Sequence, residues 1–183
     1  MSTTKIAVVF ATADGQTHKI AENIAALLRE RGAIADVTDG HLMPDDFPFH
    51  EYDGAIVGGS IHMGKNTPFM EELIVTHSQA LVHMPTAFFA ISLSSTGIAA
   101  EEDEDEADEH ISALLDHTHW RPRLVGLFAG GLRYTQYGFV KRQVASDVYE
   151  RLNWVSIDRF TYAYLHIVTE RKERHDQQIG GAG

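Results

Sequence analysis

The feature that most constrains the fold is a regular alternation of short apolar runs with helical patterns. The first run, "KIAVVF" (5–10), is rich in β-branched residues, as expected of a strand buried on both faces of a parallel sheet. Five apolar runs predict strands, at residues 5–10, 33–38, 52–61, 84–93 and 122–132. Strands that alternate with helices indicate an α/β fold, here a doubly wound five-stranded parallel sheet in the order 2-1-3-4-5.

Helical patterns fill most of the intervals between these runs. After the first run, apolar residues recur at three- and four-residue spacing until Gly32 ends the pattern, at Ile20, Ile24, Leu27 and Leu28. Two further helices are predicted over 68–82 and 105–119. The proline-rich segment 39–51 is expected to replace or shorten the helix between the second and third strands.

Length and composition exclude several classes of function. A chain of 183 residues with 44% hydrophobic content fits one domain over residues 1–183. Without cysteine it has no disulfides, thiolate metal sites or cysteine nucleophiles, which suits a cytoplasmic protein. We expect no signal peptide, because "MSTT" leads directly into the first strand, and no membrane span, because no apolar stretch reaches about 20 residues. The net charge of −11 disfavours nucleic acid and anionic lipid as partners.

The turn between the first strand and the first helix is a candidate anion site. It reads "ATADGQT" over residues 11–17, and the helix that follows presents unpaired backbone N–H groups and the positive end of its dipole. Thr12 and Thr17 add hydroxyl donors, and Gly15 allows close approach of the backbone, so a terminal phosphate could bind without lysine. The alternative is a turn that only starts a helix, with Asp14 or Thr17 as the N-cap.

The amino-acid sequence of this turn indicates which phosphate ligand it could bind. Neither G-x-x-x-x-G-K-[ST] nor G-x-G-x-x-G occurs in it, which disfavours ATP and NAD in their usual cradles. The T-x-x-G-x-T spacing resembles the FMN phosphate loop of flavodoxins. "ATADGQT" is more similar to one branch of that superfamily, the quinone-dependent protoporphyrinogen oxidases of the flavodoxin-like type. Asp14 is the unusual member, because a carboxylate beside a phosphate is unfavourable unless it bonds local backbone.

Loops at the carboxyl ends of the third and fourth strands are expected to surround the flavin. Ligands of such sheets bind outside these ends, where the strand order reverses. The loops are "GGSIHMGKNTPF" (58–69) and "SLSSTGIAA" (92–100), whose glycines and hydroxyls would let backbone amides reach a flat polar ring; ordinary turns use the same residue types. The candidate FMN-binding residues are Thr12, Ala13, Asp14, Gly15, Gln16, Thr17, Ser60, Ile61, His62, Met63, Gly64, Ser94, Ser95, Thr96, Gly97, Gly131 and Tyr134.

A basic and aromatic cluster follows the fifth strand, within 129–142. Arg133, Tyr134 and Tyr137 lie close together in the sequence, followed by Lys141 and Arg142. Such a cluster suits a planar anionic substrate, with rings on its face and cations on its carboxylates. The alternative is tyrosines that pack under the sheet while charged tips reach solvent.

The resemblance extends over roughly residues 5–142. "GGSIHMGK", "MPTAFFAISL", "HWRPRL" and "LFAGGLRYTQY" are similar to stretches of the protoporphyrinogen oxidase family, in the same order. The resemblance implies FMN, oxidation of a porphyrinogen to the porphyrin within haem biosynthesis, and transfer of the electrons to a quinone. Two segments depart from the family: the chain after the fifth strand, and "EEDEDEADE" (101–109), which has eight carboxylates in nine positions. We interpret that run as a solvated helix start, with a docking patch as the alternative.

Candidate catalytic residues are His62, Arg133 and Tyr134. His62 lies in the loop expected beside the flavin ring, where it would donate a hydrogen bond or move a proton; a plain loop histidine is the alternative. Arg133 would pair with a substrate carboxylate, and Tyr134 would line the flavin face. His117 and His119 do not share a helix face, so no metal site is predicted.

Two other functions compete with that of an FMN oxidoreductase. One is a flavodoxin-like electron carrier without its own substrate, and the other is a fold relic that binds no flavin and works through protein contacts. Carrier flavodoxins are similar to one another in covering the ring with aromatic residues from the two loops. "SIHMGK" and "SLSSTG" contain no such residue, which favours a ring face open to a substrate.

Overall fold

Five parallel strands form the centre of the sheet. The computed structural model describes residues 3–11, 15–62, 65–66, 68–92, 101–129, 138–142, 153–154 and 157–180. The parallel strands run in the order β2-β1-β3-β5-β6, which confirms the predicted order 2-1-3-4-5. They are β1 (Lys5–Ala11), β2 (Ile34–Asp39), β3 (Gly54–His62), β5 (Thr86–Ser92) and β6 (Leu124–Ala129).

Three short antiparallel strands extend this centre, and the sequence did not predict them. β7 (Gly138–Arg142) pairs with β6, and β8 (Asn153–Trp154) pairs with β7. On β3, the two-residue strand β4 (Lys65–Asn66) forms a small hairpin with the end of the strand. The chain after β6 therefore returns along the sheet edge instead of leaving it.

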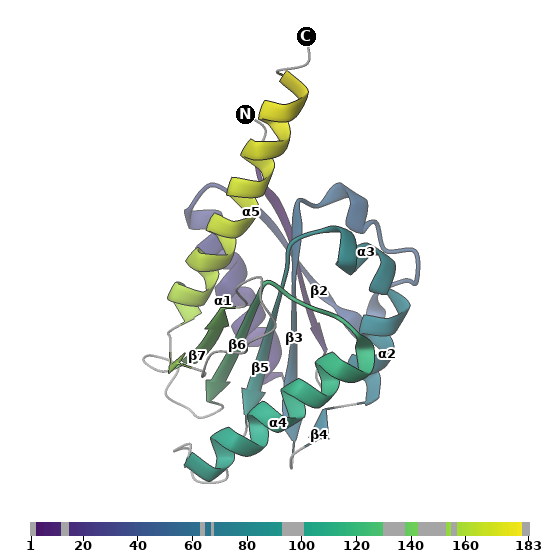
Figure 1. The fold of residues 1–183 in the computed structure, drawn as a ribbon, viewed down its shortest axis with the longest axis vertical. Helices are drawn as coiled ribbons and strands as arrows, with labels where there is room; N and C mark the ends of the chain where they lie inside the picture. Colours follow the sequence, from purple (N-terminus) through teal and green to yellow (C-terminus); the bar gives the residue numbers. More distant parts are fainter. Residues whose placement is uncertain are drawn as a thin grey trace.

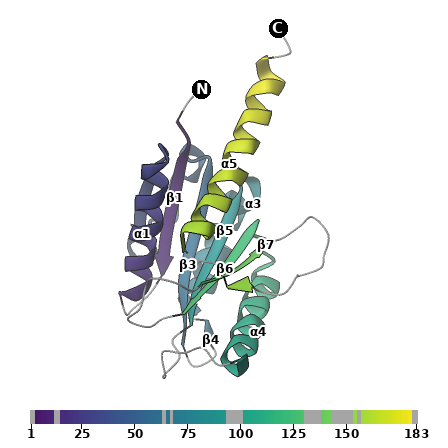
Figure 2. The same ribbon diagram turned by 90° about the vertical axis from the view of Figure 1, so that its left-hand side faces the viewer.

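Helices cover both faces of the sheet (Figures 1 and 2). One face carries α1 (Gln16–Glu30) and α5 (Ile157–Gly180), whose apolar side chains share a buried cluster with Ile6, Val8 and Ile56. The other face carries α2 (Pro68–Thr76), α3 (Ser78–His83) and α4 (Glu101–Thr118), packed over Ala7, Val9 and Val57. Successive residues of β1 thus enter opposite cores, as the period of a strand buried on both faces requires.

Three helical segments differ from the expected ones, and a fourth agrees with the prediction. The helix predicted over 68–82 is divided into α2 and α3 at His77, and α4 begins at Glu101, before the expected residue 105. Segment 39–51 forms only two 3₁₀ turns, η1 (Gly40–Leu42) and η2 (Phe49–Glu51), which confirms a shortened connection. The long helix α5 was not predicted. Among the described residues, no helix combines the length and apolar character that crossing a bilayer requires.

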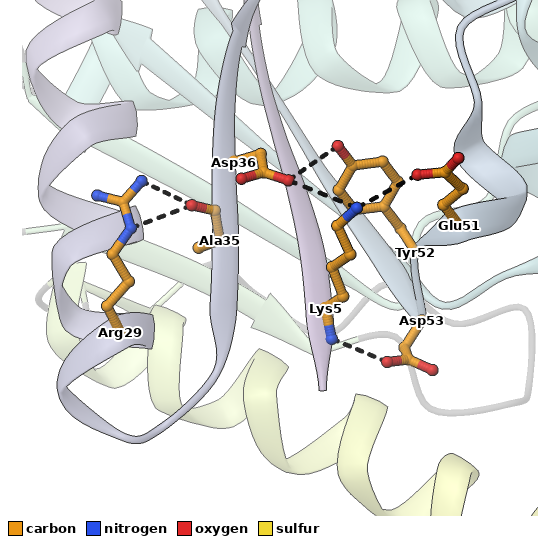
Figure 3. Close-up of polar contacts among 7 residues, drawn as sticks. All are labelled: Lys5, Arg29, Ala35, Asp36, Glu51, Tyr52 and Asp53. Carbon is orange, nitrogen blue, oxygen red and sulfur yellow. Dashed lines mark hydrogen bonds and ion pairs between the residues drawn. The ribbon is translucent and has the colours of Figure 1, made fainter. Parts of the chain in front are cut away.

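Paired charges join the amino ends of the strands (Figure 3). Lys5 Nζ lies 3.4 Å from Glu51 Oε2, 3.8 Å from Asp36 Oδ2 and 4.4 Å from the centre of the Tyr52 ring. The Tyr52 hydroxyl donates to Asp36 at 3.0 Å. Asp53 accepts from the backbone N–H of Lys5 at 2.8 Å. These contacts connect β1, β2 and the segment before β3 at a single edge.

Helix α5 is attached to the same edge. The fully buried Tyr164 hydroxyl lies 3.0 Å from the carbonyl oxygen of Ala55 and 2.8 Å from that of Pro85, and it donates to them. Lys172 Nζ donates to Asp53 Oδ2 at 2.7 Å. Burial raises the pKa of Tyr164 well above its usual value. The phenol therefore stays neutral and holds α5 across β3 and β5.

Trp120, in the "WRP" stretch, belongs to the core of the other face. It is 2% exposed, and its Nε1 donates to Thr86 Oγ1 at 3.1 Å. Its ring meets that of Phe88 edge to face, with centroids 5.8 Å apart. This tryptophan fixes the end of α4 on β5 and does not lie at the carboxyl edge of the sheet.

Candidate flavin site at the carboxyl edge

Gly15 begins the first helix at the carboxyl end of β1. It is the N-cap of α1 and adopts a φ of 74°, a left-handed conformation that favours glycine, and it has no side chain to cap the helix. Thr17 lies inside the helix, so the interpretation of Thr17 as the N-cap was wrong. Thr12, Ala13 and Asp14 lie outside the described residues. The first N–H groups of α1 have no intrahelical partner, as at any helix start.

Thr17 is completely buried, and its hydroxyl is unpaired. Its relative exposure is 0%, and within the described part of the chain Oγ1 has no hydrogen-bond partner. The neighbouring Gln16 is half-buried and exposed His18 stacks on Phe10, with ring centroids 4.6 Å apart. A buried hydroxyl without a partner costs about 1–3 kcal/mol. A ligand that accepts a hydrogen bond there would recover this energy.

Ser60 is a second buried hydroxyl without a partner, on the same side of the sheet. Its exposure is 4%, and its Oγ has no partner among the described residues. Ser60 follows Ile56 by four residues in β3, so both point to the face that α1 covers. The register pairs Ala11, the last residue of β1, with Gly59. Ser60 therefore lies just beyond the end of β1, where the turn to α1 begins.

The glycines before Ser60 are closely packed, Gly58 most of all. A Cβ at Gly58 would collide with the ring of Phe89, and one at Gly59 would collide with the Met70 side chain. Both residues lie inside β3, where their strand neighbours are buried. Packing thus accounts for Gly58 without a flavin, and the approach of this backbone to a flavin stays a prediction. Their absence of a side chain serves the two cores.

His62 belongs to a strand rather than to the expected loop. β3 continues to His62, and the hairpin pairs Ile61 with Asn66 and His62 with Lys65. The backbone at Ile61 and His62 is thus held by ladder pairing at the carboxyl edge. Met63 and Gly64 lie outside the described residues. The role of His62 at the flavin stays a prediction.

Most remaining candidates lie outside the described residues: Ser94, Ser95, Thr96, Gly97, Gly131, Arg133, Tyr134 and Tyr137. The strands that precede them end side by side, since Ser92 of β5 pairs with Ala129 of β6. Because β3, β5 and β6 are parallel, the segments that follow all start from one edge, the edge of Thr17 and Ser60.

Lys141 and Arg142 lie at the opposite edge. Antiparallel pairing sets Lys141 against Val125 and Arg142 against Leu124, at the amino end of β6. A substrate at the carboxyl edge is therefore separated from these positions by the length of a strand. The prediction that Lys141 and Arg142 join a substrate cluster at the carboxyl edge was therefore wrong, because the antiparallel return of the chain as β7 is not visible in the sequence.

A shallow cavity beside the turn was not anticipated. It has a volume of about 390 Å³ and is lined by Phe10, Gly15, His18, Glu22, Val37 and Asp39. His18 Nε2 lies 3.6 Å from Glu22 Oε1, one helical turn away. The sequence feature that could have predicted this cavity is Phe10 at the end of the first strand, followed by His18 near the start of the helix. The cavity widens the open space in front of Gly15.

No metal site accompanies these groups in the part of the chain that the structure describes. His117 is exposed near the end of α4, and His119 lies after the helix with a φ of 54°. Among the described groups at the carboxyl edge, the unpaired hydroxyls and the dipole of α1 suit an anion.

Solved structures with the same fold define the class of the protein. A flavodoxin from the domain Archaea superposes with a TM-score of 0.53 at 15% identity and covers 92% of this chain and 99% of that one. The rubredoxin oxygen:oxidoreductase of Desulfovibrio gigas gives a TM-score of 0.57 at 11% identity and covers 92% of this chain and 36% of that one. These neighbours show that the fold is flavodoxin-like.

Sequence comparison narrows the class to a family. A model described as a flavodoxin domain matches residues 7–152. The protoporphyrinogen IX dehydrogenase [quinone] of Escherichia coli (strain K12) is 31% identical over 138 residues, 75% of each chain. The protein of that name from Leishmania major is 28% identical over 142 residues, 75% of this chain and 59% of that one. The chain belongs to this flavodoxin-type family of oxidoreductases, which confirms the resemblance; α5 lies beyond the matched residues.

Proposed function

We propose that the chain is an FMN-dependent oxidoreductase that oxidises a porphyrinogen to the porphyrin and passes the electrons to a quinone or a similar acceptor. The observation that carries the cofactor is the pair of buried, unpaired hydroxyls of Thr17 and Ser60 beside the start of α1. The names of the relatives support the substrate and acceptor.

The terminal phosphate of FMN fits the start of α1. There, backbone N–H groups and the helix dipole favour an anion, and the Thr17 hydroxyl would donate to a phosphate oxygen. Thr12, Ala13, Asp14, Gly15 and Gln16 would complete this phosphate turn. FAD is disfavoured, because the proposed single domain leaves little to hold an adenosine half. When bound, FMN supplies the chemistry of accepting an electron pair from carbon and releasing it to an acceptor.

The remaining candidates hold the ring and the substrate in this proposal. The end of β3 and the loops after β5 and β6 would contact the ring, through Ser60, Ile61, His62, Met63, Gly64, Ser94, Ser95, Thr96, Gly97, Gly131 and Tyr134. His62 would hold or move a proton at its imidazole nitrogen. Arg133 would pair with a substrate carboxylate, and Tyr134 would line the face of the ring. We also propose a cytoplasmic location and a role in haem biosynthesis.

The cofactor is tested by flavin release and titration. Protein denatured after purification should release FMN and not FAD. The double variant Thr12→Ala/Thr17→Ala should weaken FMN binding, because each hydrogen bond to a charged group contributes about 1.5–3 kcal/mol. Thr118→Ala is a matched control, since Thr118 is also buried but its hydroxyl donates to Leu114 O at 2.8 Å, in α4. Unchanged FMN affinity in the double variant would contradict the phosphate turn.

The substrate is tested with Arg133→Ala. This variant should lower kcat/KM for the porphyrinogen while FMN content and reduction by dithionite stay as in the wild type. A structural arginine would instead lower stability and flavin content together. If the wild type binds FMN but oxidises no porphyrinogen with either quinone or dye acceptors, the electron carrier replaces the enzyme as the function. If the wild type oxidises the porphyrinogen and Arg133→Ala retains all of this activity, only the assignment of Arg133 is wrong and the enzyme proposal stands.

A further inference from the structure

A cavity at the amino edge of the sheet has no part in the proposed flavin chemistry. Its volume is about 550 Å³, within the range of small-molecule sites, and it lies between α5 and the segment before β6. The residues that matter for its chemistry are Pro85, Arg123, Ile167, Arg171, Arg174 and His175. Residues of α5 from Ile167 onward form one wall of the cavity. The carboxyl-terminal half of this helix extends past the amino edge of the sheet (Figures 1 and 2).

The arginines that line this cavity are incompletely paired. Within the described part of the chain, the Arg123 side chain makes no hydrogen bond or ion pair, and only its backbone N–H is used, by Thr86 O. Arg171 donates from Nη2 to the carbonyl oxygen of His83 at 2.8 Å, a neutral acceptor. Two guanidinium charges thus face one cavity without a carboxylate partner among the described residues.

The acidic residue in the cavity wall is already engaged. Glu170 Oε2 lies 3.2 Å from Arg174 Nη2, and its Oε1 lies 3.2 Å from His166 Nε2. It therefore compensates Arg174 and leaves Arg123 and Arg171 uncompensated. In a chain with 26 acidic and 15 basic residues, such a surplus of positive charge needs a specific reason.

The shape of the cavity suits a small molecule better than a single ion. Pro85 is buried and Ile167 half-buried, so they add apolar surface beside the guanidinium groups. A second cavity of about 480 Å³ adjoins it and shares Pro85, Arg171 and His175. Guanidinium groups bind carboxylates and phosphates through two parallel hydrogen bonds, which an ammonium group does not match.

We propose that this cavity binds a small molecule with two or more anionic groups, carboxylates or phosphates, held by Arg123 and Arg171 with Arg174 beside them. The site is separate from the flavin edge. Pro85 and Arg123 directly precede β5 and β6, whereas the flavin candidates follow the far ends of these strands. Strands of six or seven residues separate the two by about 20 Å, so the ligand is an effector and not the substrate.

Isothermal titration of the full-length protein with inorganic pyrophosphate and with citrate tests the proposal and separates the two ligand chemistries. At low ionic strength, where exposed charges are least screened, we expect submillimolar binding of at least one of them. Stronger binding of pyrophosphate would assign a phosphate ligand, and stronger binding of citrate a polycarboxylate. Arg123→Gln should weaken that binding about tenfold or more through the loss of charged hydrogen bonds.

Two control variants decide where the anion binds. Arg159→Gln removes the same charge from an exposed arginine of α5 that, among the described residues, also lacks a partner but lies outside the cavity, and it should leave the affinity unchanged. Thr17→Ala should also leave it unchanged, which separates this site from the proposed phosphate turn. Binding that falls equally in Arg123→Gln and Arg159→Gln, binding lost only in Thr17→Ala, or no binding of either anion would overturn the proposal.

Discussion

The two edges of the sheet differ in whether their polar side chains have hydrogen-bond partners. At the amino edge, Asp53 accepts from Lys5 N at 2.8 Å and from Lys172 Nζ at 2.7 Å, and the Tyr164 hydroxyl bonds two carbonyl oxygens. At the carboxyl edge, the hydroxyls of Thr17 and Ser60 are buried and have no partner among the described residues. The Asp53 carboxylate and the Tyr164 hydroxyl are thus paired without a ligand, whereas the two hydroxyls at the carboxyl edge are not.

This difference separates residues that stabilise the fold from residues kept for binding. Paired groups lower the free energy of the folded state, whereas an unpaired buried hydroxyl raises it by about 1–3 kcal/mol. A substitution at the amino edge should therefore lower stability and leave flavin affinity unchanged. A substitution at the carboxyl edge should do the reverse.

The largest loss of stability is expected for Tyr164→Phe. It removes the hydroxyl that bonds the carbonyl oxygens of Ala55 and Pro85, and it should lower the free energy of unfolding by about 2 kcal/mol. Urea unfolding of the flavin-free protein measures this. Tyr162→Phe is the control, because the half-buried Tyr162 contacts Arg31 through its ring and should change stability by less than about 0.5 kcal/mol. Equal effects of the two substitutions would show that the amino edge is not held by pairing.

A somewhat smaller loss is expected for Asp53→Asn. The carboxylate is 28% exposed and its partner Lys172 16% exposed, so the pair is only partly screened by solvent. Its loss should lower the free energy of unfolding by about 1–2 kcal/mol. Asp176→Asn, on the exposed part of α5, should have no measurable effect. FMN titration of Asp53→Asn should match the wild type, and a weakened affinity would contradict the separation of the two edges.

Tyr52 should make stability depend on pH in the alkaline range. Burial, followed by its hydrogen bond to Asp36, raises the pKa of Tyr52 to about 12. Because the pKa of Tyr52 in the folded protein lies above the usual 10, the protonated phenol stabilises the fold. This contribution is complete below pH 10 and is lost as the pH rises toward 12. Tyr52→Phe should cost about 1 kcal/mol at neutral pH and reduce the alkaline loss. An unchanged alkaline profile in the variant would contradict this assignment.

The smallest effect is expected from His77, which lies between α2 and α3. Burial lowers its pKa below 6.5, an effect that Asp45 partly opposes. Below pH 6.5 the imidazole is protonated in the unfolded chain but still neutral in the folded protein. The free energy of unfolding therefore falls as the pH drops from 6.5 through the lower pKa of folded His77. His77→Gln should flatten the profile on the acid side, whereas the exposed His117→Gln should not. Unfolding curves at mildly acidic and neutral pH compare the three proteins.

The parallel sheet could be predicted because its signal is local. Each central strand is a short apolar run, and the turn after the first one has a recognisable pattern of polar residues. Helix α5 also had a local signal, since Phe160, Tyr164 and Val168 recur every four residues and are buried. The prediction missed this helix, because polar and charged residues separate the three apolar positions.

Antiparallel pairing was not predictable in the same way. Whether the chain after β6 continues or returns depends on hydrogen bonds to a distant strand, and this decides on which edge Lys141 and Arg142 lie. The hairpin that places His62 in β3 likewise depends on pairing with β4. The close packing at Gly58 and Gly59 depends on side chains from β5 and α2. Nor does a sequence reveal that Thr17 and Ser60 are unpaired, since only the fold shows which donors surround them.

The most direct test of the account is Thr17→Val, which keeps the shape of the side chain and removes its unpaired hydroxyl. Threonine and valine have similar helix propensities, so the hydroxyl is the main difference. We predict that the flavin-free variant unfolds with a free energy about 1 kcal/mol higher than the wild type, measured in urea. We also predict that its affinity for FMN falls by about tenfold or more. A variant that is less stable than the wild type and binds FMN equally well would contradict the claim that this edge is kept incomplete for a flavin phosphate.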